Sequence, residues 1–358
     1  MKPQIFSLNL IRAVAIILVI FDHSRCLDID PDFNRFLGVL LGPDAALFFM
    51  ISGALLLPVR GSVREFLTKR LIRVLIPFVI WVIIYAVLYY IEGYISKPVL
   101  ASAIRWSWIN YDFEAGWFIP VIISSYFVLP ILSPWIERAR DNQYRYMFKL
   151  WALAGLVPWL AAFIGTRESS NIFMYFANAI PYFVAGYYIL RKNEWGLWND
   201  NAECAAAAPA ATAQRLAARR TQRPSAASRR KKVVWIVALL LVGVVIPYLL
   251  KTHTNTGCNS NAAGDYRSIN SIAFGVLIFS LLIRVRTLTP PLNRVVEFLS
   301  RYSYGAYLCH SIGWSIIGVY HFPELLDSTL WLFTVQFFGS FALTWLLSKI
   351  PFLGRYIV

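Results

Sequence analysis

Charged residues are scarce in this 358-residue sequence. Asp, Glu, Lys and Arg make up 15% of it, whereas 58% is hydrophobic. A soluble domain carries roughly 25% charged residues, so the composition excludes a soluble catalytic domain. The alternating pattern of barrel strands is missing as well. Stretches of 18 or more mostly apolar residues recur instead, and lipid forces each of them to be helical. We therefore expect an all-α membrane protein.

Cysteine is also rare. The four cysteines, Cys26, Cys204, Cys258 and Cys309, form neither a CxxC pair nor a Cys/His spacing typical of a metal site. The sequence therefore predicts no metal site, no redox pair and no permanently bound cofactor. Cys26 and Cys258 fall in loops predicted on the outer side of the membrane, where thiols can pair. A disulfide between them stays an open alternative.

Positive charge sets the orientation of the expected spans. Of the 34 Lys and Arg residues, 26 fall on one side of the membrane and 7 on the other, and Arg12 lies inside the first span. Cytoplasmic loops are enriched in Lys and Arg, so the pattern predicts about ten transmembrane helices with both termini cytoplasmic. The net charge of +15 follows from this topology and does not predict nucleic-acid binding. The expected spans are residues 5–24, 38–57, 74–95, 117–136, 147–165, 171–190, 233–250, 268–284, 302–320 and 329–350.

Residues 199–232 differ in composition from the rest of the chain. Ala, Arg and Ser dominate this segment, and it has no apolar stripe. We interpret it as a disordered, basic cytoplasmic linker inside a single transmembrane domain that covers residues 1–358. The alternative is contact with membrane lipids, since anionic headgroups attract basic residues near the surface.

Ionisable residues inside spans are costly and therefore informative. The first span contains Arg12 and His23, which are eleven residues apart, or about three full helical turns. Both side chains are thus expected on one face, separated by roughly 16 Å along the helix axis. The alternative is that Arg12 extends to the inner headgroups and His23 lies at the outer interface. A common polar stripe favours a face that points into the helix bundle.

Three further groups of residues are candidates for a site. Lys69, Arg70 and Arg73 precede the third expected span, and two guanidinium groups on one helical face suit phosphate oxygens. The alternative is that they only mark the cytoplasmic end of the span. Tyr304, Tyr307 and His310 follow one face of the ninth expected span, either in helix packing or in substrate binding. Trp117 opens the fourth expected span, where Trp is most often an interfacial anchor.

Together these motifs resemble the acyltransferase-3 family, bacterial integral membrane O-acyltransferases that modify surface glycans. The motifs occur in family order over nearly the whole chain. The sequence departs from the family at Asn9, where many members have Asp, and in the 199–232 segment. The motifs are Arg12 and His23 separated by ten residues, Phe48-Phe49-Met50-Ile51-Ser52-Gly53, Arg70-Leu71-Ile72-Arg73 followed by Pro77, Phe78 and Trp81, Trp117-Phe118, and Ser303 to His310.

The resemblance implies an enzyme of the bacterial inner membrane that uses acyl-CoA, usually acetyl-CoA, as donor substrate. The acceptor would be a hydroxyl of a surface glycan or of its lipid-linked precursor. Lys69, Arg70 and Arg73 would bind the phosphates of the donor at the cytoplasmic face, and the pantetheine arm would reach His23. Trp117, Tyr304, Tyr307 and His310 would bind substrate.

The expected chemistry centres on His23 and Arg12. His23 is the candidate general base, with a covalent acyl-histidine as the alternative. Asp22 is not expected to orient His23, because adjacent helical residues do not face each other. Arg12 would stabilise developing negative charge or hold the donor. The competing hypothesis from another class is a transporter or flippase for a lipid-linked sugar or small anion, although no inverted repeat is found.

Overall fold

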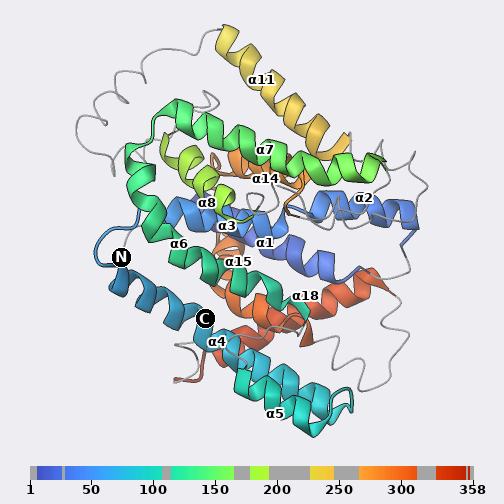
Figure 1. Ribbon diagram of the computed structural model, residues 1–358. Coiled ribbons are helices and arrows are strands. Elements are labelled where there is room, and N and C mark those ends of the chain that lie inside the picture. Colours follow the sequence, from blue (N-terminus) through green and yellow to red (C-terminus); the bar gives the residue numbers. More distant parts are fainter. Residues whose placement is uncertain are drawn as a thin grey trace. The chain divides into compact units, whose positions relative to one another are not determined.

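The structure, a computed structural model, describes residues 6–25, 29–106, 114–164, 178–192, 226–245, 266–312, 328–351 and 354, which form helices joined by turns and short loops (Figure 1). These residues contain no strand, which confirms the predicted all-α class. The helices longer than one turn are α1 (Phe6–His23), α2 (Pro31–Leu41), α3 (Asp44–Leu56), α4 (Val63–Ile91), α5 (Lys97–Trp106), α6 (Phe118–Arg138), α7 (Asp141–Ile164), α8 (Ile180–Tyr187), α11 (Ala226–Leu240), α14 (Ile269–Leu282), α15 (Pro290–Cys309) and α18 (Thr329–Leu347).

Five stretches within the described ranges are long and apolar enough to cross a membrane. Two shorter apolar helices, Val233–Val245 and Ile269–Leu282, accompany them. Parts of four other expected spans fall on residues outside the described ranges, so the count of ten stays a prediction. The five stretches are Phe6–His23, Phe36–Leu56, Val63–Ile91, Phe118–Arg138 and Thr329–Leu347.

Two helices begin well before the apolar runs that predicted them. α4 starts at Val63 because the Ser62 hydroxyl caps it and accepts a hydrogen bond from the Glu65 amide, 3.2 Å away. α15 starts at Pro290, where the missing N–H of proline costs the first turn nothing. The basic residues before both apolar runs are consequently helical, so their side chains are fixed relative to the span.

Two other predictions concern residues that the structure leaves largely undescribed. Of the segment 199–232, only 226–232 is described, and it forms the first turns of α11. Cys26, Cys204 and Cys258 lie outside the described residues, so the disulfide alternative stays open. Cys309 is a buried free thiol.

The chain forms two compact units, the first comprising Met1–Ile11, Gly38–Leu57 and Ala139–Thr289. In this unit α3 and α8 cross at two glycines. A Cβ added to Gly53 would lie 1.9 Å from the carbonyl oxygen of Phe183, and one added to Gly186 would lie 1.9 Å from that of Met50. The two backbones therefore touch, as small residues allow in membrane helices. The glycine of the Phe48–Gly53 motif serves this contact.

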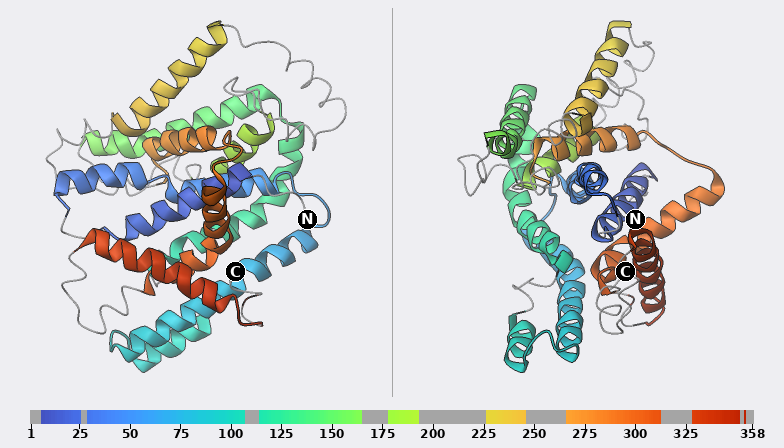
Figure 2. Two further views of the ribbon diagram at one scale, coloured as in Figure 1. Left: turned by 180° about the vertical axis from the view of Figure 1, so that it is seen from behind. Right: turned by 90° about the vertical axis from the view of Figure 1, so that its right-hand side faces the viewer.

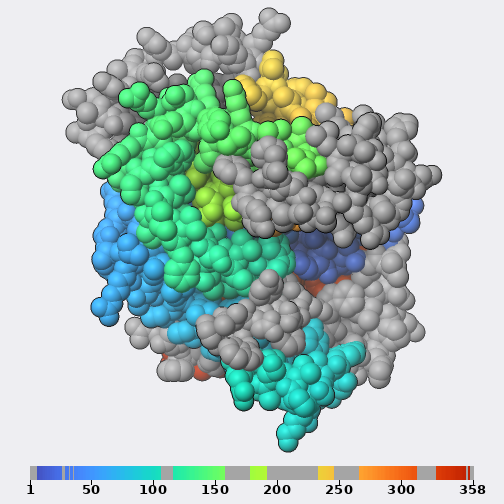
Figure 3. All heavy atoms as spheres, in the orientation of Figure 1, coloured from blue at the N-terminus to red at the C-terminus, as the bar shows by residue number. Residues whose placement is uncertain are grey.

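The second unit comprises Arg12–Leu37, Pro58–Arg138 and Pro290–Val358. Within it α15 contacts α18 and α4, and α4 also contacts α5 and α6 (Figures 1 and 2). α5 is short and mostly exposed, as its cyan atoms show (Figure 3). Every candidate residue named above for catalysis or for binding falls in this second unit.

Candidate functional site

Arg12 contacts α15, and His23 contacts His310, the residue that follows α15. The Arg12 guanidinium donates a hydrogen bond to the Ser300 hydroxyl, at 3.2 Å, and the rings of His23 and His310 lie 5.0 Å apart, nearly edge to face. His310 is ten positions after Ser300 and His23 is eleven positions after Arg12, so the two segments run in the same direction with matched rise. The structure thus places the polar stripe of α1 against a helix.

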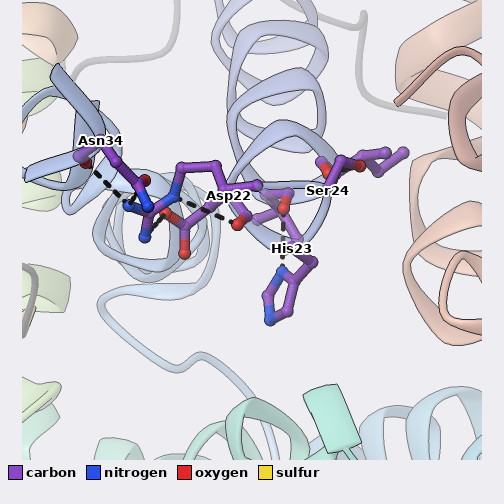
Figure 4. Close-up of polar contacts among 7 residues, drawn as sticks. Asp22, His23, Ser24 and Asn34 are labelled. Atoms are coloured by element: carbon purple, nitrogen blue, oxygen red, sulfur yellow. Dashed lines mark hydrogen bonds and ion pairs between the residues drawn. The ribbon is translucent and has the colours of Figure 1, made fainter. Parts of the chain in front are cut away.

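His23 takes its orientation from its own helix. Its Nδ1 lies 2.9 Å from the carbonyl oxygen of Val19. A carbonyl only accepts, so Nδ1 carries the proton of the neutral ring and Nε2 carries the lone pair. Asp22 instead pairs with Arg25 at 2.8 Å, and the two neighbouring side chains leave α1 in different directions (Figure 4). This confirms that Asp22 does not orient the imidazole.

The end of α1 is also attached to α18. Phe21 packs on Phe333 with ring centroids 5.2 Å apart, and the Ser24 hydroxyl lies 2.7 Å from the side-chain oxygen of Gln336. Ser24 is fully buried and Gln336 is 1% exposed. A buried polar contact of this kind holds the end of α1 that carries His23 against α18.

His310 is buried beside the partly buried His23. Its Nδ1 lies 2.6 Å from the carbonyl oxygen of Tyr307, and the Ser311 hydroxyl lies 3.4 Å from its Nε2. The Tyr307 ring is in turn 5.8 Å from His310 and 5.4 Å from Phe118. His310 has backbone and side-chain partners, which suits a role in helix packing. It also adjoins His23, which suits a role in substrate binding.

Three guanidinium groups gather near the start of this stripe. The buried Tyr126 of α6 interacts electrostatically with Arg12, Arg70 and Arg73, and Arg73 also interacts with each of the other two arginines. Within the described part of the chain, none of the three arginines forms an ion pair with a carboxylate. Like charges gathered in this way, without an acidic partner, form a site that favours an anion.

Lys69 differs from the two arginines with which it was grouped. Its ammonium pairs with Glu65 at 2.7 Å, one turn earlier on α4, and both side chains are largely exposed. Such a pair contributes little to stability, but it neutralises the Lys69 charge locally. Among the three predicted anion ligands, Lys69 thus has a carboxylate partner and Arg70 and Arg73 have none among the described residues; the assignment of all three stays a prediction.

The remaining predicted residues lie in helix contacts. The Tyr304 hydroxyl donates to the Val74 carbonyl at 2.7 Å, which attaches α15 to α4. Trp117 ends a 3₁₀ turn (Glu114–Trp117), and its ring lies 6.3 Å from that of Phe118. Phe118 reaches Tyr307, so the second residue of the Trp-Phe motif contributes to the group around His310.

Three residues at the site escaped the sequence interpretation. Gln336 and Ser300 could have been found by the rule used for Arg12, because both are polar residues within or next to apolar helices. Tyr126 carried no such signal in a sequence with 19 tyrosines. Only the fold brings it to the stripe.

A comparison with protein families decides the class. The model of an acyltransferase domain (Acyl_transf_3) matches residues 5–349, nearly the whole chain. The chain belongs to the acyltransferase-3 family. Neither the curated proteins nor the solved structures give a match. Membership in the acyltransferase-3 family, together with the apolar helices, supports a multi-pass membrane acyltransferase.

Proposed function

We propose that this acyltransferase-3 protein moves an acyl group, in the simplest case acetyl, from cytoplasmic acyl-CoA to a hydroxyl of a surface glycan or its lipid-linked precursor. The observation that carries the proposal is the stripe on α1. Arg12, Arg70 and Arg73 gather around Tyr126 at one end of the stripe, and roughly 16 Å further along α1, His23 adjoins His310.

The donor fits the two ends of this stripe. The phosphates of coenzyme A are polyanionic, and guanidinium groups bind phosphate oxygens through paired hydrogen bonds. Arg12, Arg70 and Arg73 would hold these phosphates. The pantetheine arm has a length comparable to the rise between Arg12 and His23, which would bring the thioester to the imidazole.

The acyl transfer then needs one base. Nε2 of His23 takes the proton of the acceptor hydroxyl as its oxygen attacks the thioester carbonyl carbon. The C–S bond breaks, the sulfur leaves as the coenzyme A thiolate, and the protonated imidazole returns the proton to it. The products are an O-acyl ester and free coenzyme A. In the covalent variant Nε2 attacks first and carries the acyl group to the acceptor.

The predicted topology would give the two substrates opposite ends of the site. The excess of Lys and Arg on one side supports ten spans with both termini in the cytoplasm of a bacterial inner membrane. The arginines then open to the cytoplasm, where acyl-CoA is made, and His23 lies toward the outer half. Tyr307, Phe118 and Trp117 would adjoin the acceptor, since aromatic faces suit sugar rings.

The experiment that tests the proposal measures thiol release. Membrane vesicles with and without the chain are given acetyl-CoA labelled in the acetyl group, and free thiol and labelled glycan are followed together. We expect both to rise only with the chain. Unchanged thiol, with a lipid-linked sugar or anion crossing the vesicle membrane, would establish the transporter hypothesis instead.

The anion site makes a separate prediction about Arg73. Arg73→Gln removes a charge-assisted contact to phosphate, so we expect the KM for acetyl-CoA to rise about tenfold to a hundredfold. Lys69→Gln, one turn away and paired with Glu65, is the matched control and should leave KM within about twofold. Equal effects of the two variants on KM would place the phosphates elsewhere.

A further inference from the structure

Trp81 has a buried hydrogen-bond donor with no acceptor. The side chain is 3% exposed, and its indole Nε1 has no hydrogen-bond partner in the part of the chain that the structure describes. A buried Trp N–H usually finds a partner, because leaving it unpaired forfeits the bond it made with water. The unpaired N–H is therefore available to donate to an acceptor that a ligand brings to this position.

The position of Trp81 on α4 is fixed by two hydrogen bonds to α15. The Val74 carbonyl accepts from Tyr304, at 2.7 Å, and Tyr85 donates to the Leu308 carbonyl, at 3.1 Å. Trp81 is seven residues after Val74 and four before Tyr85, which puts all three on one face of α4. All three are buried. This face is the one that meets α15.

The same spacing places Trp81 between the two ends of the proposed donor site. Arg73 immediately precedes Val74, and Leu308 is two residues before His310. Counted along α4, Trp81 lies about 12 Å beyond Arg73 and about 6 Å short of Tyr85. An acyl-CoA molecule whose phosphates are bound by the arginines and whose thioester reacts at the imidazoles must place the middle of its pantetheine arm at the level of Trp81.

We propose that the indole N–H of Trp81 donates a hydrogen bond to an amide carbonyl of the pantetheine arm, an inference that rests on the proposed function. The arm is mostly apolar but contains two amides between its phosphate and its sulfur, and their carbonyl oxygens are the acceptors available there. Trp81 is then a donor-binding residue. It acts on the affinity for acyl-CoA before any bond changes.

The chain supplies a matched control in Trp151 of α7. Its side chain is also 3% exposed, and its Nε1 is likewise without a partner among the described residues, but it belongs to the first unit. Trp81→Phe keeps a ring and removes the N–H, so we expect the KM for acetyl-CoA to rise about tenfold with kcat nearly unchanged. Trp151→Phe should leave both constants unchanged.

A second experiment changes the acyl donor. For an acetyl-CoA analogue with methylene groups in place of the arm amides, wild type and Trp81→Phe should show the same KM, because the hydrogen bond is already lost. If Trp81→Phe does not fold, benzothienylalanine at position 81 preserves the shape of the indole and lacks the N–H.

The outcomes separate this inference from the proposed function. If wild type releases no thiol from acetyl-CoA, the proposed function fails. If wild type is active and the KM of Trp81→Phe matches that of Trp151→Phe, the hydrogen bond is refuted and the function stands. A penalty for Trp81→Phe that persists with the amide-free analogue would also overturn the inference.

Discussion

Replacing His23 with Ala is expected to reduce acetyl transfer about a thousandfold while leaving the protein folded. General base catalysis contributes roughly 10² to 10⁴ in rate. Because Nδ1 of His23 donates its proton to the Val19 carbonyl, Nε2 is the ring nitrogen that can act as the base. The measurement is the initial rate of thiol release by purified protein at saturating acetyl-CoA. The variant protein should elute as wild type does in gel filtration.

Asp22→Asn is the matched control for His23→Ala. Asp22 is the adjacent residue on α1, but it pairs with Arg25 and points away from the imidazole (Figure 4). We expect its rate to stay within about threefold of wild type, because a partly exposed ion pair contributes little. Near-normal turnover by a folded His23→Ala protein would remove His23 from the mechanism.

Gly186→Ala is expected to prevent stable folding of the first unit. The added Cβ would lie 1.9 Å from the Met50 carbonyl oxygen, which is backbone and cannot rotate away. α3 and α8 would have to separate along their whole contact, and overpacking of this severity costs at least about 3 kcal/mol. The measurement is the yield of monodisperse protein and its thermal unfolding in detergent.

Gly339→Ala in α18 controls for the effect of alanine itself. A Cβ at Gly339 meets nothing within 4 Å, and alanine favours a helix over glycine by about 1 kcal/mol. This variant should therefore be as stable as wild type or slightly more stable. If Gly186→Ala unfolds at the same temperature as the wild-type protein, α3 and α8 do not meet at this glycine.

The sequence was most informative where burial is expensive. Arg12 and His23 stood out because charged or ionisable groups inside an apolar helix need a partner, and the helical period alone placed both on one face. Their partners, Ser300 and His310, come from a helix almost three hundred residues later, and only the second was suspected. Periodicity identifies a face but not the helix that covers it.

Helix ends were predicted poorly for a related reason. Hydropathy marks the apolar part of a helix, whereas α4 and α15 continue through polar residues because Ser62 and Pro290 start them earlier. The motif glycine Gly53 was recognised only by resemblance. Its reason is a tertiary contact with Phe183, which no local pattern shows.

The most direct test is the structure of the protein bound to a non-hydrolysable acyl-CoA analogue. We predict that the coenzyme phosphates contact Arg70 and Arg73 and that the carbon in place of the thioester carbonyl lies within reach of Nε2 of His23. An analogue whose phosphates avoid these arginines, or whose acyl end points away from His23, would contradict the account.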